Sequence, residues 1–319
     1  MRKMLLLVGV LLTLAISDAS AFSKKQDGKN NTQDIQIFTA PAGKITSKKI
    51  DAAFESLGFI VDGNNDMNKP FNLRFHKQYY NTYRLMIAHH PKSVLALVKK
   101  HAGAGLLSPL SMSIYSDDTA HTLNMATLTL HGMSRITQIP ENDKDLIAYH
   151  NLLNEALAKA LPGGKFQTLN VKTLSNEKLA TTFTTEFEVE EGSDIVEAKE
   201  SFQAEFEGEL EPIGFLFPGY IDLNDEFTTA GYKGFDFYDT YSICKFDVIF
   251  PVSKNHPEVG AFAPCTFYMY KKKDEDTVHM GFASVENWVT AATITEKEAL
   301  EPLRAAQKMI ENVVNELIE

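Results

Sequence analysis

The most constraining feature of this sequence is a stretch that it contains twice. Residues 105–115 read GLLSPLSMSIY, and residues 260–270, which lie 155 positions later, read GAFAPCTFYMY. Glycine, proline and tyrosine stand at the same places in both stretches, and the same offset places Met125 on Met280. Agreement at so many spaced positions indicates a duplicated unit, and its period is too long for the stacked repeats of a solenoid. The repeat therefore predicts two similar domains.

This repeat sets the predicted domain boundaries. A first copy covers residues 34–169, a second copy covers residues 183–319, and the linker between them covers residues 170–182. Upstream, YNTY at 80–83 resembles YDTY at 238–241, with the offset enlarged by three. Because the two copies are alike, we expect them to pair as an intramolecular pseudo-dimer.

The N-terminus has the pattern of a secretory signal peptide. Two basic residues precede an apolar run at 5–16, and residues 19–21, which read ASA, fit a signal-peptidase cleavage site. The run is shorter than the ~20 apolar residues that a membrane-spanning helix needs. We therefore predict a signal peptide at 1–21, a flexible leader at 22–33, and a periplasmic or secreted protein that does not span the membrane.

The formal net charge of −11 limits the partners of this chain. No basic stripe is present that could neutralise phosphates, so we expect no nucleic acid partner. Glu186, Glu188 and Glu190 alternate with apolar residues, which predicts a strand with one solvated acidic face. A site for a cation or a cationic partner is the alternative interpretation of this face.

Local patterns predict the fold class. Polar turns separate the apolar runs at 110–116 and 123–130, and likewise those at 265–271 and 278–285, which predicts an antiparallel hairpin in each copy. Each copy ends in a long amphipathic helix. The predicted fold is α+β, with two similar two-layer sandwiches, each a mostly antiparallel sheet with helices packed on one face.

Helix and loop signals differ between the copies. Pro91 suits the first turn of a helix, and Asp194 suits a helix N-cap. Pro251 precedes residues without an apolar stripe, so we expect a shorter element or a loop there. Residues 58–83 and 214–241 mix glycine, aromatic residues and aspartate, which is common in binding loops, and we expect any small-molecule pocket where such a loop faces the turn of the repeated stretch. Loops that only cover the core are the alternative interpretation.

Two segments of the sequence resemble a known family. The stretch YRLMIAHHPKSVLALVKKHAGAGLLSPLSMSIY in the first copy is similar to the core of domain-of-unknown-function family 302, and HPEVGAFAPCTFYMY in the second copy resembles part of that core. The family core runs from a strand through a Cys-Asn-Pro turn and a helix to Gly-Leu-Leu-Leu-Pro-Cys. The resemblance implies a small α/β sandwich, leaves dimerisation open, and brings no biochemical role.

The copies depart from this family pattern at its cysteines. His89–His90 replaces Cys-Asn in the first copy, and we expect Ile249–Phe250 at that place in the second copy. The cysteine after the proline is Leu110 in the first copy and Cys265 in the second. Neither copy is therefore expected to hold both thiols of the pattern.

Cys244 and Cys265 are the only cysteines of the chain. We expect both on neighbouring strands of the second copy, where their Cα atoms could come within the ~4.4–6.8 Å that a disulfide requires. Export to an oxidising compartment favours a disulfide, and two separate buried thiols are the alternative. A redox-active pair is disfavoured because no C-x-x-C motif is present.

The histidines are concentrated in the first copy. His89 and His90 stand where a strand meets a helix N-terminus, and could present imidazole and backbone N–H groups to a ligand. His121 and His131 are expected at the two ends of one strand, too far apart to share a metal ion. No spacing of a transition-metal site is present, so we predict no metal site, and the sequence identifies no cofactor.

These observations favour a binding protein. The candidate ligand-binding residues are His89, His90, Ser108, Tyr238, Tyr241 and Cys265, and the candidate disulfide joins Cys244 to Cys265. No nucleophile elbow, phosphate-binding loop or dinucleotide fingerprint is present, which disfavours catalysis without excluding it. The leading hypothesis is an exported, non-catalytic tandem-domain protein that binds a small ligand or a partner protein. The alternative is a metal- or thiol-dependent redox protein or enzyme that uses Cys265 or the first-copy histidines.

Overall fold

The structure is a computed structural model that describes residues 33–43, 45–167, 179–187, 189 and 194–319. The predicted signal peptide lies outside the described residues, as do nearly all of the predicted leader and most of the predicted linker. Among the helices that are described, none combines the length and the apolar character needed to cross a membrane.

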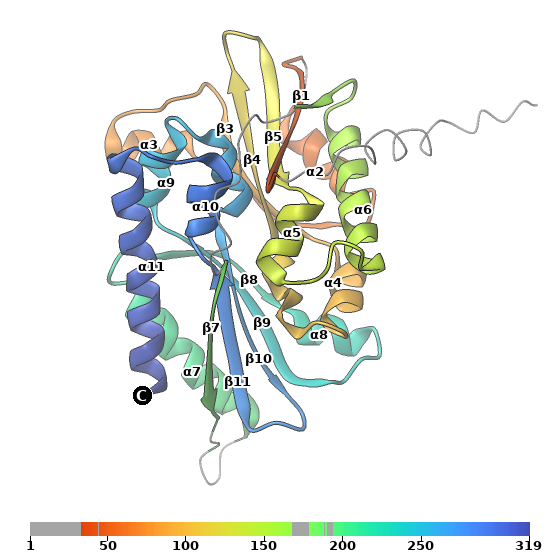
Figure 1. The fold of residues 1–319 in the computed structure, drawn as a ribbon, viewed down its shortest axis with the longest axis vertical. Coiled ribbons are helices and arrows are strands. Elements are labelled where there is room, and N and C mark those ends of the chain that lie inside the picture. The colour runs from red at the N-terminus through yellow and green to blue at the C-terminus, as the bar shows by residue number, and fades with distance from the viewer. Residues whose placement is uncertain (1–32, 44, 168–178, 188, 190–193) are drawn as a thin grey trace, which may run out of the picture. The chain divides into compact units, whose positions relative to one another are not determined.

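The first half of the chain contains one antiparallel sheet and its helices (Figure 1). The strands pair in the order β2-β3-β4-β5-β1-β6. The elements, in chain order, are β1 (Ile35–Pro41), α2 (Ser47–Glu55), β2 (Ile60–Asp66), α3 (Asn68–Phe75), β3 (Tyr83–His89), α4 (Pro91–Val98), η1 (Ala102–Leu107), β4 (Leu110–Asp117), β5 (Thr122–Leu128), α5 (Leu130–Thr137), α6 (Lys144–Ala160) and β6 (Lys165–Gln167).

The second half repeats this element order, apart from the short β6. Its sheet has the order β7-β11-β10-β9-β8, which is the order of the first sheet read through equivalent strands. The elements are β7 (Ala180–Glu186), α7 (Ile195–Leu210), β8 (Leu216–Asp222), α8 (Leu223–Thr229), β9 (Phe235–Cys244), α9 (Phe246–Ser253), η2 (Pro257–Phe262), β10 (Cys265–Lys272), β11 (Thr277–Ala283), α10 (Glu286–Ala292) and α11 (Lys297–Ile318). The predicted α+β class and the two hairpins are confirmed.

Local signals explain where several helices begin. The carboxylate of Asp194 accepts hydrogen bonds from two backbone N–H groups of the first turn of α7, which confirms the predicted N-cap. Pro91 stands at the first position of α4, where its missing N–H leaves no helical hydrogen bond unmade. The hydroxyl of Thr46 accepts the backbone N–H of Lys49 and so caps α2, which begins at Ser47.

Two sequence-based expectations about loops are wrong. Residues 58–83 and 214–241 contain an edge strand followed by a short helix, namely β2 with α3 and β8 with α8. A helix also spans the expected loop at Pro251, because α9 begins earlier, at Phe246, and buries Val248, Ile249 and Val252. Burial of these side chains outweighs the hydrogen bond that Pro251 cannot donate within the helix.

Strand register corrects the expected alignment of the copies. Tyr83 lies opposite Tyr115, and Tyr238 lies opposite Tyr270, so the offset stays at 155 for β3 and β9 and is not enlarged by three. By the same offset, Cys244 takes the place of His89 at the end of its central strand. The expectation that Ile249–Phe250 fills this place was therefore wrong.

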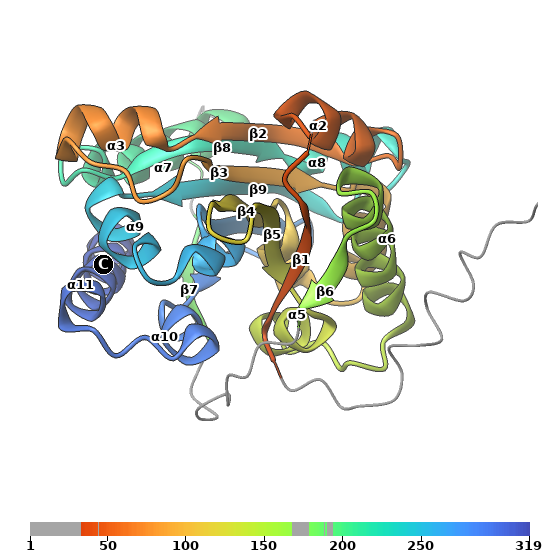
Figure 2. The same ribbon diagram turned by 90° about the horizontal axis from the view of Figure 1, so that it is seen from above.

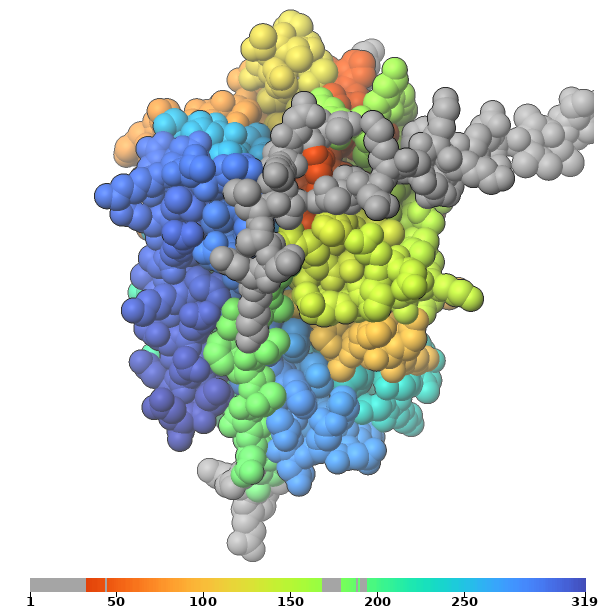
Figure 3. Space-filling model, in the orientation of Figure 1, coloured from red at the N-terminus to blue at the C-terminus, as the bar shows by residue number. Residues whose placement is uncertain are grey.

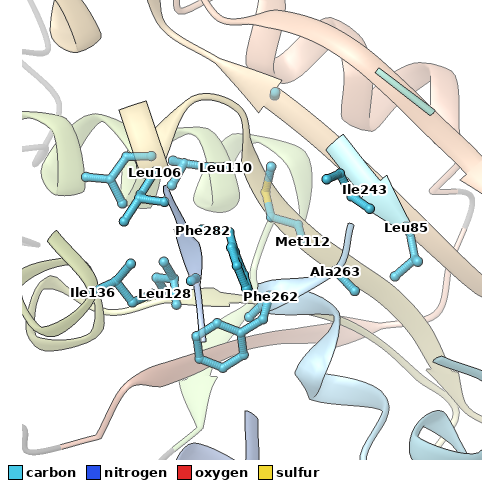
Figure 4. Close-up of a cluster of buried hydrophobic side chains, with 14 of the residues drawn as sticks. Leu85, Leu106, Leu110, Met112, Leu128, Ile136, Ile243, Phe262, Ala263 and Phe282 are labelled. Atoms are coloured by element: carbon cyan, nitrogen blue, oxygen red, sulfur yellow. The ribbon is translucent and has the colours of Figure 1, made fainter. Parts of the chain in front are cut away.

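The two halves share one hydrophobic core. The described residues after the N-terminus form a single compact unit, within which α2 and α6 lie at one end and α11 at the other (Figure 2). Figure 4 shows side chains of both halves in one cluster, including Leu106 and Met112 of the first half and Phe262 and Phe282 of the second. The division into independent domains stays a prediction.

The junction between the halves is built from reciprocal contacts. The hydroxyl of Ser111 on β4 donates to the carbonyl of Pro264 at 2.6 Å, and the hydroxyl of Thr266 on β10 donates to the carbonyl of Pro109 at 2.9 Å. These donors and acceptors are each related by the offset of 155. The segment η2 packs on β4 and β5, and η1 packs on β10 and β11. Each half thus places its 3₁₀ segment on the other half's sheet.

Candidate functional site

His89 lies at the junction, between two carboxylates. It is 1% exposed at the end of β3, its Nδ1 lies 2.7 Å from Oδ2 of Asp62 on β2, and its Nε2 lies 2.8 Å from Oε1 of Glu226 on α8. Burial lowers the pKa of His89, but the hydrogen bonds and negative charges of Asp62 and Glu226 outweigh it and raise the pKa to about 9. At neutral pH the ring is an imidazolium with both nitrogens occupied, so it joins the halves instead of facing a ligand.

Among the neighbouring candidates, His90 is engaged within the protein, and the hydroxyl of Ser108 is buried with no hydrogen-bond partner among the described residues. His90 caps α4, because its Nδ1 accepts the backbone N–H of Ser93 at 3.2 Å. Burial, together with the positive charge of Lys92, lowers the pKa of His90. Ser108 is fully buried before the cis peptide bond to Pro109. Neither side chain is presented on the surface as a site.

Tyr238 and Tyr241 point to opposite faces of β9. The hydroxyl of Tyr238 donates to the carbonyl of Ala102 at 2.5 Å and accepts the backbone N–H of Gly105 at 3.0 Å, both in η1. A side chain at position 105 would overlap the Tyr238 ring, so this approach requires glycine. Tyr241 packs against Phe206 of α7 on the other face. The two tyrosines therefore do not share a site.

Both cysteines are free thiols at the start of β10 and the end of β9. Cys265 lies opposite Ile243, the residue before Cys244. Burial raises the pKa of each thiol to about 12, so both stay protonated at neutral pH. The adjoining cavity is about 30 Å³ and apolar, with Trp288 and Phe282 in its wall. This space suits water-sized molecules and not a substrate, and the disulfide stays a prediction.

No group of three or more His, Cys, Asp or Glu side chains in the described part of the chain has the arrangement of a metal site. His121 precedes β5 and His131 lies within α5, so the expectation that they end one strand was wrong for His131. His131 instead contacts Glu141 at 2.5 Å. The structure thus gives His131 a carboxylate partner within the protein, whereas His121 is exposed.

The sequence analysis missed a buried carboxyl group on β9. Asp239 is fully buried, and its oxygens accept the hydroxyl of Tyr220 at 2.9 Å and the amide of Gln203 at 3.1 Å, with the ammonium of Lys199 at 3.5 Å. Burial raises the pKa of Asp239 to about 6, although the positive charge of Lys199 opposes this shift. The partners come from β8 and α7, and no local pattern signals that they meet.

The first half holds a related network with opposite charges. Arg84, which the offset of 155 places on Asp239, donates from Nε to Oδ1 of Asn64 at 2.8 Å. The amide of Asn64 donates to Asp51 of α2 at 2.7 Å. Asp51 and Lys199 each stand five residues after the N-cap of their helix. The strand carries the cation in the first half and the anion in the second.

A groove of about 400 Å³ lies between β7, α7 and the end of α11. Figure 3 shows α11 and β7 side by side on this face. Phe187 and Phe202 stack edge to face with ring centroids 6.2 Å apart, and carboxylates surround this aromatic surface. The lining residues are Thr185, Glu186, Phe187, Glu197, Ala198, Ser201, Phe202, Glu205, Leu317, Ile318 and Glu319. The volume falls within the roughly 300–1,000 Å³ of small-molecule sites.

This groove was not among the predicted ligand sites, although the alternating glutamates were a sequence signal for it. Glu186, the first of the alternating glutamates, lies on its rim. Glu188 and Glu190, which the same pattern placed on this face, lie outside the described residues. The aromatic surface could not be foreseen, because α7 supplies half of it across the sheet.

Comparison with known proteins identifies one domain in the second half. Residues 193–317 match the family described as domain of unknown function DUF302, so a DUF302 domain is present there. A similar solved structure is the crystal structure of an uncharacterized conserved protein DUF302 from Bacillus stearothermophilus. The match covers 43% of this chain and 98% of the other chain, with 14% sequence identity and a TM-score of 0.35. No curated protein matches the sequence.

Proposed function

We propose that this chain is an exported, non-catalytic binding protein whose two copies form an intramolecular pseudo-dimer, and that the groove of the second copy binds a small cationic ligand with an apolar portion. The observation that supports this choice of ligand is the composition of the groove. The partly exposed ring of Phe202, which packs edge to face with the largely buried Phe187, offers an apolar and cation-attracting surface, and Glu186, Glu197 and Glu205 line the same groove. An aliphatic amine would place its chain on the rings and its ammonium among the carboxylates.

The reciprocal contacts support the pseudo-dimer. The two sheets have equivalent strand orders, and the Ser111 and Thr266 hydrogen bonds are related by the offset of the sequence repeat. Helix α3 of the first half packs on α9 of the second, where Phe75 and Phe250 stack at 4.0 Å. Helix α8 of the second half correspondingly packs on α4 of the first. Such exchange of equivalent contacts is the pattern of a twofold dimer.

Thiol or histidine chemistry is not favoured. Nucleophilic and redox cysteines depend on the thiolate, whereas burial holds both thiols of this chain in the protonated form. A general base needs a free nitrogen near neutral pH, and both nitrogens of His89 are engaged by carboxylates. These properties support a role in binding. Export rests on the N-terminal sequence pattern alone.

The ligand proposal is tested by titration calorimetry with three probes of one chain length, namely hexylamine, hexanol and hexanoate. We expect binding of hexylamine, weaker binding of hexanol, and no binding of hexanoate. The double variant Glu197→Gln and Glu205→Gln should weaken hexylamine about tenfold. Glu209→Gln, on the same helix but outside the groove lining, is the matched control. Equal binding of all three probes, or an unchanged affinity in the double variant, would reject the proposal.

A further inference from the structure

Two ion pairs between the halves have the same direction of charge. Arg74 on α3 pairs with Asp247 on α9 at 2.5 Å, and His89 pairs with Glu226 on α8 at 2.8 Å. In both cases the first half supplies the cation and the second half supplies the anion. In addition, the ammonium of Lys99, at the C-terminal end of α4, lies 5.0 Å from the centre of the Tyr232 ring of the second half.

Equivalent positions can be assigned across the two copies. The offset of 155 holds for α4 and α9, and it places Asp247 on Lys92. For α3 and α8 the offset is 156, because Asn68 and Asn224 make the same hydrogen bond, donating to the carbonyls of residues 81 and 236. With these offsets, Glu226 corresponds to Pro70.

A pair of two first copies would lack these contacts and add a repulsion. Arg74 would face Lys92, the counterpart of Asp247, so two cations would meet. His89 would face Pro70, the counterpart of Glu226, and would lose one of the two carboxylates that hold its charge. Like charges brought together at an interface disfavour the complex.

A pair of two second copies would leave anions without partners. Glu226 would face Cys244, the counterpart of His89, and its carboxylate would have no cation. Asp247 would face Ala230, the counterpart of Arg74. A carboxylate left unpaired at a largely buried position strongly disfavours a complex, because its lost hydration is not compensated. Both like-with-like pairings are therefore electrostatically inferior to the observed pairing.

We infer that this interface is a selective docking surface whose partner is the other copy within the same chain. The first copy presents Arg74 and His89, and the second presents Asp247 and Glu226. Pairing of two first copies or of two second copies is therefore electrostatically disfavoured. These charges favour contact between the two halves of one chain and disfavour dimers in which equivalent halves of two chains pair. This inference rests on the pseudo-dimer in the proposed function, and it is independent of the ligand groove.

The test uses the full chain with reversed charges. Arg74→Asp and Asp247→Arg are made singly and together, and hydrogen exchange of the α3 and α9 amides is measured with the mass in solution by light scattering. Because both side chains are about half exposed, each single reversal should raise exchange a few-fold. The double reversal should restore exchange to within twofold of the original protein, and all four proteins are compared at increasing concentration.

Glu226→Lys provides the stronger perturbation, because it places an ammonium against the imidazolium of His89. We expect exchange of the α8 and α4 amides to rise at least tenfold and a concentration-dependent dimer to form. Glu155→Lys on the exposed side of α6 introduces the same change of charge away from the interface and should do neither. If single reversals leave exchange and mass unchanged, or if the double reversal fails to restore them, the selectivity is rejected. A monomer that stays fully protected in every variant would retain the pseudo-dimer and reject only its charge selection.

Discussion

Raising the pH should remove one defined contribution to the stability of this protein. His89 is held between Asp62 on β2 and Glu226 on α8, and its pKa of about 9 lies above the roughly 6.5 of an unfolded histidine. The other titratable groups near His89 are His90, whose pKa is lowered by burial, and Lys92. A raised histidine pKa stabilises the fold fully below pH ~6.5, and this stabilisation is lost as the pH rises through 9. This rise of the His89 pKa to about 9 corresponds to about 3 kcal/mol of stability.

The measurement is the free energy of unfolding by urea at pH 6.5, 8 and 9.5 and constant ionic strength, for the original protein and for His89→Gln. Both proteins lose stability above pH ~8.5, because the two buried thiols ionise more easily when unfolded. That contribution cancels in the difference between them. We expect the difference to shrink by ~2–3 kcal/mol between pH 6.5 and 9.5.

A difference between the original protein and His89→Gln that stays constant across this range would refute the reasoning, since it would mean that His89 is neutral throughout. A loss confined to pH values below 6.5 would refute it as well, because the pKa would then be lowered by burial and not raised by the carboxylates.

Three further outcomes are expected. Gly105→Ala should destabilise the protein by roughly 1–3 kcal/mol in urea unfolding, because the new methyl group overlaps a buried tyrosine ring, whereas Gly103→Ala, with its nearest neighbour at 3.8 Å, should be tolerated. Because the pKa of Asp239 is raised to about 6, its ionisation disfavours the fold, and the original protein should lose up to ~3 kcal/mol of stability between pH 4 and 6.5. The variant Asp239→Asn should not show this loss. The two thiols should react with an aromatic disulfide reagent at pH 7.5 only after denaturant is added, because burial keeps both in the protonated form.

The sequence predicted the elements whose signals are local. Asp194 and Pro91 mark helix starts by chemistry that acts within one turn, and the structure confirms both. The edge strands β2 and β8 were missed because they are mostly half exposed and interrupted by register shifts near Gly63 and Gly219, so neither shows a clean apolar alternation. Local patterns fail where a strand lies at the edge of a sheet.

The role of His89 could not be predicted for a different reason. Its partners are Asp62, which precedes it by 27 residues, and Glu226, which follows it by 137. The sequence places His89 correctly at the junction of a strand and a helix, but the two carboxylates that determine its charge arrive through the sheet and through the other half. The groove could not be predicted for the same reason, because Phe187, which follows β7, and Phe202 on α7 meet only in the folded protein.

The two kinds of charge difference between the copies have different consequences. Inside the copies, Arg84 with Asp51 and Asp239 with Lys199 are reversed together, so each copy keeps its own charges compensated. At the junction, His89 is compensated only by Asp62 of its own copy and Glu226 of the other. A change compensated within one copy leaves that copy able to fold by itself, whereas a change compensated across the junction makes each copy depend on the other. If the two copies arose by duplication, the residues at the junction are therefore the ones that make the copies no longer interchangeable. Separating the copies should leave the carboxylate of Glu226 without its cationic partner.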